Sequence, residues 1–277
     1  MLSWMSTSTC FFLDKVYVSS TILWVCTDMS SIVITGIKGI PEVRQGADLA
    51  HIIIEAASKQ GLTLKNGDIV VVTSKIISKA EDRIIKMSEI KPSRIAINFS
   101  RILKMNPRKV EIILSEAKRI VRMARGRIIV ETRHGFICAN GGIDQSNLDS
   151  GLLSLLPNDS DSSARKILND IKEESGVDVA VIVTDTFGRP WREGQTNVAI
   201  GVAGISPLRS YAGQKDTYGY ALKVTNIAIA DEIASASELV MGKLERVPVA
   251  IVRGLKYDFA RGNIHSLIRK TSKDLFK

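Results

Sequence analysis

Three stretches of the sequence end an apolar run in side chains that can bind a metal ion or a phosphate group. The first, HGFICANGGIDQSNL (134–148), passes through two glycines to a carboxylate, a hydroxyl and an amide at Asp144, Ser146 and Asn147. Glycines let the backbone approach a ligand closely, and the polar groups suit hard cations and phosphates. A glycine turn followed by a helix capped by Asp144 or Ser146 explains the same residues equally well.

The second stretch begins at the end of the apolar run IVVV. Ser74, Lys75, Ser78 and Lys79 follow within a few positions. Ammonium groups neutralise phosphate oxygens as point charges, and hydroxyls can donate to them. Lysines after a strand are more often simply solvated, so this stretch is weak evidence when taken alone.

The third stretch, VTDTFGRPWREGQTN (183–197), places Asp185 and Thr186 at the end of an apolar strand. A carboxylate at the end of such a strand is a common magnesium ligand. Arg189 and Arg192 follow, and their guanidinium groups can hold a carboxylate or a phosphate. A surface loop with a salt bridge is the alternative.

The three stretches together favour magnesium and phosphoryl chemistry. The sequence has no Walker-type glycine loop and no His/Cys cluster for zinc or for a Cys–His nucleophile. His134 is a weak candidate base because no partner acid accompanies it, and Cys138 is expected to be a small core residue.

Composition bounds the class of protein. The chain has 277 residues, of which 45% are hydrophobic and 24% charged, as in globular proteins. The formal net charge of +9 suits nucleic acid, anionic lipid or small polyanionic substrates. The densest basic stretch, 116–127, favours the solvated face of a helix over a nucleic-acid patch.

The spacing of the three cysteines fits neither a zinc site nor a disulfide framework. This spacing indicates a reducing, cytoplasmic setting.

Residues 1–28 differ from the rest of the chain. They hold two of the three Trp and two of the three Cys, and Asp14 and Lys15 interrupt their apolar run. They match neither a signal peptide nor a good transmembrane helix. We expect Met29 to be the true start, with 1–28 a gene-model extension or a disordered tail and 29–277 the core. A membrane anchor is the minor alternative.

The expected elements alternate irregularly along the chain. Strands are expected within 31–37, 64–75, 126–140, 177–191, 196–205 and 247–255, and helices within 47–60, 92–104, 107–124, 155–176 and 224–242. The irregular order predicts an α+β or mixed α/β fold, not a doubly wound Rossmann sheet.

Seven blocks give the sequence a family resemblance. GIPEVRQGADL, VVTSKIISKAEDR, NGGIDQSNL, VTDTFGRPWREGQTNVAIGVAGI, GQKDTYGYALKVT, ADEIASASELVMGK and VPVAIVRG occur here in the order seen in the coenzyme F-420:L-glutamate ligase family, also called F-420-0:gamma-glutamyl ligase. The resemblance covers residues 33–255. It implies a two-lobed, intertwined homodimer with mixed sheets and flanking helices. The implied reaction of coenzyme F-420 biosynthesis adds L-glutamate to F-420-0, then extends it through a gamma-linkage.

The resemblance also implies cofactors and site residues. It implies GTP as co-substrate and two Mg²⁺ or Mn²⁺ ions, with K⁺ as a further candidate cofactor. The nucleotide contacts carried over by motif are Ile40, Pro41, Glu42, Val43, Ser74, Lys75, Lys79, Asn147, Met241, Gly242 and Lys243. The metal ligands are Asp144, Asp185 and Thr186, the catalytic residues are Lys79, Asp144 and Asp185, and the acceptor contacts are Arg189 and Arg192.

One position departs from the family pattern. Lys243 stands where the family often has an acidic or amide metal ligand. Either Glu245 completes the second metal shell, or the Lys243 ammonium supplies the charge that a metal supplies elsewhere. The alternatives are a gamma-glutamyl ligase for another polyanionic cofactor such as a pterin, a nucleotide-binding regulator without activity, and a basic nucleic-acid-binding protein.

Overall fold

The computed structural model describes residues 13–18, 21–26, 31–124 and 126–274. The chain divides into two units, Met1–Ile32 and Val33–Lys277. In the first unit, β1 (Leu13–Val18) pairs antiparallel with β2 (Thr21–Cys26). The other residues of the expected leader lie outside the described part, and the separation of 1–28 from the core stays a prediction.

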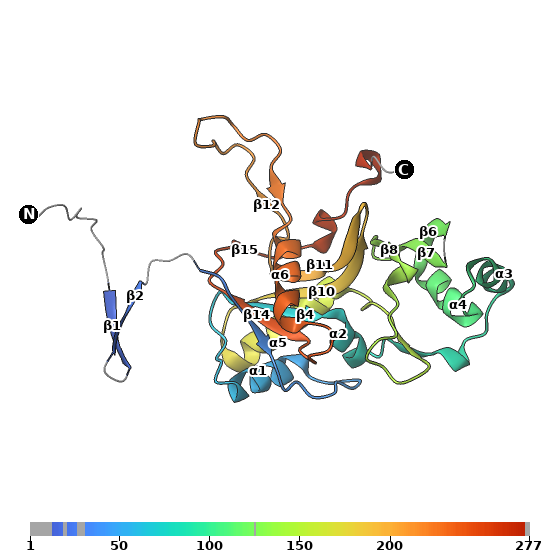
Figure 1. Cartoon of the computed structure of the whole chain (residues 1–277), viewed down its shortest axis with the longest axis horizontal. Helices are drawn as coiled ribbons and strands as arrows, with labels where there is room; N and C mark the ends of the chain where they lie inside the picture. The colour runs from blue at the N-terminus through green and yellow to red at the C-terminus, as the bar shows by residue number, and fades with distance from the viewer. Residues whose placement is uncertain (1–12, 19–20, 27–30, 125, 275–277) are drawn as a thin grey trace, which may run out of the picture. The chain divides into compact units, whose positions relative to one another are not determined.

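A six-stranded mixed sheet organises the second unit (Figure 1). Its strand order is β15-β11-β10-β4-β14-β3, and the only parallel pair among these strands is β4 with β10. The strands are β3 (Val33–Ile37), β4 (Ile69–Thr73), β10 (Ala180–Arg189), β11 (Arg192–Ile205), β14 (Val249–Arg253) and β15 (Phe259–Ala260). The described chain thus has the expected mixed α+β fold, without a doubly wound pattern.

Helices cover both faces of this sheet. In β4, Val70 and Val72 join one apolar cluster, with α1 (Leu49–Lys59) and α5 (Ser160–Ser175). Ile69 and Val71 join the other, with α6 (Ile229–Met241). The four apolar side chains of β4 are fully buried, and the burial of each stabilises the fold by about 1.5–3 kcal/mol. Burial on both faces explains why the run IVVV does not alternate with polar residues.

A smaller group of elements between residues 84 and 155 has a core of its own. It contains β5 (Ile84–Lys86), α3 (Arg94–Leu103), α4 (Pro107–Glu116), β6 (Ala117–Ala124), β7 (Arg127–Thr132), β8 (Ile137–Ala139) and β9 (Leu152–Ser154). The strands expected within 126–140 are confirmed as β7 and β8, which pair antiparallel as a hairpin. Pro107 opens α4, where its missing N–H costs nothing.

The helix expected at 107–124 is wrong in its second half. α4 ends at Glu116, because Ala117 is extended (φ −86°, ψ 134°) and β6 begins there. β6 pairs with β7 along its length. The basic stretch 116–127 is therefore mostly strand, since hydrogen bonding to β7 outweighs the local helical pattern.

The remaining elements are short. They are α2 (Ser74–Ala80), β12 (Arg209–Ser210), β13 (Asn226–Ile227), and the 3₁₀ turns η1 (Met87–Glu89), η2 (Asn140–Gly142), η3 (Ile264–Ser266) and η4 (Thr271–Lys273). β12 and β13 are the base of an arm that extends away from the sheet in Figure 1. No helix in the described ranges is long and apolar enough to cross a membrane.

Candidate active site

The parallel pair of β4 and β10 brings two of the expected site residues together. Thr73 and Thr184 are register partners, so Ser74, the first residue of α2, and Asp185 each directly follow one member of this pair. The carboxyl ends of parallel strands meet at one edge of a sheet. The Ser74 hydroxyl donates a hydrogen bond to Oδ1 of Asp185 at 3.0 Å.

The glycine turn after β8 brings Asp144 to the same place. Gly142 has a φ of +71°, and a Cβ there would lie 2.9 Å from the Leu156 side chain. Both the backbone conformation and the close approach require glycine. The next regular element is a strand, β9. The alternative interpretation, in which Asp144 or Ser146 caps a helix, is therefore wrong.

Lys75 ties this turn to α2. Its ammonium forms an ion pair with the Asp144 carboxylate and donates to both the carbonyl oxygen and Oγ of Ser146, each at 2.6 Å. The Ser146 N–H donates to Oδ1 of Asp144 at 2.9 Å. A phosphate that binds Lys75 must therefore compete with Asp144, or a cation must take over the carboxylate.

The two carboxylates have opposite pKa shifts. Burial raises the pKa of Asp185 to about 6, and the negative charge of Asp144 adds to the rise against the hydrogen bond from Ser74. For Asp144, burial also acts to raise the pKa. Hydrogen bonds from Lys75 and Ser146 outweigh it and lower the pKa overall. The site therefore holds one carboxylate whose charge is well compensated and one, Asp185, for which burial outweighs the attraction of Lys75 and the hydrogen bonds.

This arrangement fits a divalent cation. Asp144 and Asp185 come from separate segments, and a hard cation would supply the charge that Asp185 lacks. The described residues contain no cluster of three or more His, Cys, Asp or Glu side chains that could hold a metal. A cation here would complete its shell with hydroxyl, carbonyl, water or phosphate oxygens, as magnesium commonly does.

Thr186 lies in a second cluster, near α6. Neighbouring residues of a strand point to opposite faces. Its hydroxyl donates to Oδ1 of Asn197 at 2.7 Å, across the β10–β11 pair. Lys243 donates to the Thr186 hydroxyl at 2.6 Å and lies 2.5 Å from Oε1 of Glu238. The structure therefore joins Asp144 to Asp185, and Thr186 to Lys243.

The structure shows what surrounds the Lys243 ammonium. Three oxygen-bearing side chains surround it, those of Thr186, Glu238 and Asn197, and its distance to Oδ1 of Asn197 is 3.3 Å. Glu245 instead accepts a hydrogen bond from the Leu244 N–H within its own turn. Of the two alternatives, the contacts favour the ammonium as the cation of this second cluster.

The expected nucleotide-binding segments meet beside the first cluster. Lys79, on α2, forms an ion pair with Glu42 and donates to the Asn147 carbonyl at 3.3 Å. Glu42 belongs to the segment Ile40, Pro41, Glu42 and Val43 that follows β3. Within it, Val43 is buried in the core and Glu42 is exposed. Three segments far apart in the sequence thus converge.

Other expected residues lie elsewhere. Met241, the last residue of α6, is buried in the core, and Gly242 ends that helix with a positive φ. Arg189 and Arg192 face each other at the tip of the β10–β11 hairpin, about 13 Å along the strand from Asp185. Arg189 donates to the Glu193 carbonyl at 2.6 Å. The arginines are not brought to Asp144 or Asp185.

Sequence reasoning missed Asn197 and Glu238. Asn197 is buried and directly precedes the apolar run of β11, a position at which a polar side chain could have drawn attention. Glu238 accepts from the Asn197 N–H at 3.1 Å, a contact across 41 positions that no local pattern indicates. Cys138 is buried as expected, and burial raises the pKa of its thiol to about 12.

Comparison with known proteins finds one family and several similar proteins. The family described as F420-0:Gamma-glutamyl ligase matches residues 36–254. A coenzyme F420:L-glutamate ligase of Methanothermobacter thermautotrophicus is 46% identical over 245 residues, covering 87% of this chain and 97% of that relative. Similarly named proteins of Methanopyrus kandleri and Methanocaldococcus jannaschii are 44% and 43% identical, over 85% and 77% of this chain and 94% and 86% of their own lengths.

The names of these relatives describe one class of protein, ligases that join an amino acid to a coenzyme. The chain belongs to the F420-0:gamma-glutamyl ligase family.

Proposed function

We propose that the chain is a GTP- and divalent-metal-dependent ligase that joins L-glutamate to coenzyme F420-0 and then extends it through a gamma-glutamyl link. The observation that carries this proposal is the convergence of Lys75, Lys79, Asp144 and Asp185 from three separate segments. Family membership supports the substrates, because the relatives' names include F420 and L-glutamate.

The reaction needs an activated carboxylate. A free carboxylate is a poor acyl donor, because oxide would have to leave. The acceptor carboxylate therefore attacks the γ-phosphorus of GTP, forming an acyl phosphate and releasing GDP. The glutamate amine then attacks the acyl carbon, phosphate leaves, and the nitrogen loses a proton. The protein contributes positioning and charge neutralisation.

The chain's own residues divide these tasks. A bound Mg²⁺ or Mn²⁺ supplies Lewis-acid charge neutralisation at the phosphates, and Asp144 and Asp185 would hold it. Lys75 and Lys79 neutralise the remaining phosphate charge, and the Asn147 segment and residues 40–43 border the nucleotide. Lys243 gives the Thr186 cluster a fixed positive charge. A role for K⁺, acceptor binding by Arg189 and Arg192, and action in the cytoplasm stay predictions.

We also infer that the working form is a homodimer. The arm between β12 and β13 holds its shape through its own hydrogen bonds, such as Tyr211 N to the Thr225 carbonyl at 2.8 Å and Gly213 N to the Leu222 carbonyl at 2.9 Å. Tyr218 and Tyr220 at its end are 87% and 75% exposed. An ordered arm with exposed aromatic side chains suits contact with a second copy of the chain.

One assay tests the proposed function. The protein is incubated with GTP, Mg²⁺, L-glutamate and F420-0, and mass spectrometry follows the product while released phosphate is measured. We expect a mass increment of one and then two glutamyl units, with GDP and phosphate formed in step. Asp185→Asn should lower turnover by about a hundredfold or more. Asp149→Asn, which changes an exposed acid in the loop that carries Asp144, is the matched control.

The other outcomes separate the alternatives. GTP hydrolysis without a glutamyl increment would favour a nucleotide-binding protein without ligase activity. An increment on a pterin but not on F420-0 would change the acceptor. Normal turnover by Asp185→Asn would refute the metal assignment.

A further inference from the structure

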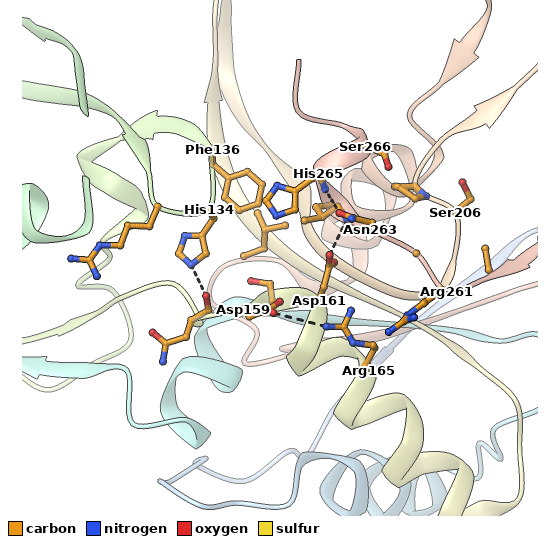
Figure 2. A pocket seen from close by; sticks show the side chains of 18 residues that line it. His134, Phe136, Asp159, Asp161, Arg165, Ser206, Arg261, Asn263, His265 and Ser266 are labelled. Carbon is orange, nitrogen blue, oxygen red and sulfur yellow. Dashed lines mark hydrogen bonds and ion pairs between the residues drawn. The ribbon is translucent and has the colours of Figure 1, made fainter. Parts of the chain in front are cut away.

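A cavity of about 810 Å³ lies beside the aromatic side chains that border the active site. Its walls come from the turn between β7 and β8, the beginning of α5, β11, and the segment from β15 to η3 (Figure 2). This volume lies within the usual range for small-molecule sites. None of the assigned site residues lines it.

The cavity wall is rich in basic side chains. Three arginines and two of the chain's three histidines line it. Arg261 is exposed to the cavity, and its side chain makes no hydrogen bond or ion pair with another described residue. In Figure 2, Arg165 and Arg261 lie on one side of the cavity, and His134 and Phe136 on the other.

The acids in the wall are already engaged by the fold. Asp161 accepts hydrogen bonds from the N–H groups of Val202 at 2.8 Å and Ile264 at 3.1 Å, one on each oxygen. Asp159 caps α5 by accepting from the N–H and hydroxyl of Ser162, at 2.9 and 2.7 Å. Asp159 also lies 3.9 Å from the Arg165 guanidinium. Arg133 donates to the Ser115 carbonyl, so Arg261 is the arginine of this wall that has no partner among the described residues.

Two buried polar atoms in the described structure lack any partner, and both belong to residues of this wall. Ser160, 4% exposed, has an unpaired Oγ. His134 has an unpaired Nδ1, while its Nε2 lies 3.1 Å from the Asn158 carbonyl. That contact needs a hydrogen on Nε2, so the neutral ring offers Nδ1 as an acceptor. Unpaired buried groups are rare in native proteins and point to a missing ligand.

Aromatic rings connect the cavity to the active site. The Phe136 ring stacks on His134 at a centroid distance of 6.0 Å and meets Phe187 edge-on at 6.1 Å. Phe187 lies two residues after Asp185, on the same face of β10. The cavity wall is therefore in contact, through Phe136, with Phe187 on the face of β10 that carries Asp185.

We propose that this cavity binds the acidic amino acid that the enzyme consumes, L-glutamate. Carboxylates pair with the guanidinium groups of Arg261 and Arg165, and the amino group donates to Nδ1 of His134 and to Oγ of Ser160. The ligand fills only the part of the cavity between these groups, because one amino acid is smaller than the whole. Its identity as glutamate rests on the proposed function; the basic cavity does not.

The first test is kinetic. Arg261→Ala should raise the KM for glutamate by about tenfold or more, while the KM for GTP stays within about twofold. Arg101→Ala on α3, also exposed and without a described partner, is the matched control and should change neither. An unchanged KM for glutamate in Arg261→Ala would overturn the proposal, even if the wild type makes the glutamyl product.

The second test is direct binding to the full chain by calorimetry. L-Glutamate should bind the wild type, and Ser160→Ala should bind it more weakly while its melting temperature stays equal or rises, because the substitution removes an unpaired hydroxyl. If inorganic phosphate bound as tightly as glutamate and lost affinity in Arg261→Ala, the amino-acid identity would be wrong. If the wild type binds glutamate, Arg261→Ala loses that binding, and the wild type forms no ligase product, the proposed function would be wrong and the proposed amino-acid site would still be supported.

Discussion

Asp185 is a carboxylate whose charge the fold opposes. Burial raises its pKa from the ordinary 3.8 to about 6, with Asp144 adding to the rise. The folded protein therefore binds this proton more tightly than the unfolded chain does. Stability from this group is highest when it is protonated in both states, and falls as pH rises from about 4 to about 6. A bound divalent cation would remove the cost.

Asp185→Asn should stabilise the metal-free protein at neutral and alkaline pH. The gain over the wild type should be small near pH 4, grow up to about pH 6 and level off at up to about 3 kcal/mol. Urea unfolding in EDTA across this range measures it. A gain that did not vary with pH would contradict the raised pKa. Added Mn²⁺ should stabilise the wild type and not the variant.

Lys243 is the residue at which the sequence resemblance predicts a departure from the family pattern. With its ammonium removed, Glu238, Thr186 and Asn197 would present oxygens without a cation. We expect Lys243→Ala to bind one more Mn²⁺ per chain than the wild type, as measured by a spin-resonance titration. Lys91→Ala, at an exposed position, should leave the stoichiometry unchanged. Equal Mn²⁺ counts in Lys243→Ala and the wild type would argue against the ammonium as a replacement cation.

At the scale of elements, the site depends on one parallel strand pair and one glycine turn. β4 and β10 deliver Ser74 and Asp185 in register. The turn after β8 brings Asp144 back over α2, where Lys75 binds it. Alternation along β10 sends Asp185 and Thr186 to opposite faces, so one strand end serves two separate clusters.

Gly142→Ala should show what this turn contributes. The substitution combines a strained positive φ with a Cβ only 2.9 Å from Leu156, so we expect a loss of about 2–3 kcal/mol and lower turnover. Gly151→Ala is the control, because its φ is also positive but nothing lies within 4 Å of a Cβ there. It should cost about 1 kcal/mol. Equal losses in urea unfolding would show that the contact with Leu156 is unimportant.

At the scale of the whole molecule, the arm between β12 and β13 is the feature that the sheet and its helices do not explain. Its hydrogen bonds are internal and its aromatic side chains are exposed. The proposed homodimer gives these side chains an apolar surface to contact.

Replacing residues 213–222 with a short Gly-Ser turn should shift the protein from dimer to monomer. The loss follows from removing the exposed tyrosines that would carry the contact. Light scattering after size exclusion measures the mass, and circular dichroism checks that the fold is kept. Tyr218→Ser with Tyr220→Ser is a milder form, for which we expect weaker association. A dimer that survives the replacement would locate the interface elsewhere.

Several features of the fold and site could be predicted from local pattern. The helix at 160–175 was predictable because Asp159 caps it and Gly176 ends it, and the buried strand at 69–73 because it is continuously apolar. The start of β6 was not, because its pairing with β7 overrides a helical pattern. Thr186 could be assigned to a polar strand end, but not to a particular cluster.

The sequence by itself determined which groups are available for chemistry: hard oxygens, lysines and arginines, set at strand ends and glycine turns whose local conformation depends on few neighbours. Only the tertiary structure decided which of them meet. Lys75 with Asp144, Lys243 with Thr186, and the basic cavity beside Phe136 all join segments distant in sequence. Such contacts follow from strand register and packing around a shared core, and charge compensation between them depends on distances that no linear pattern contains.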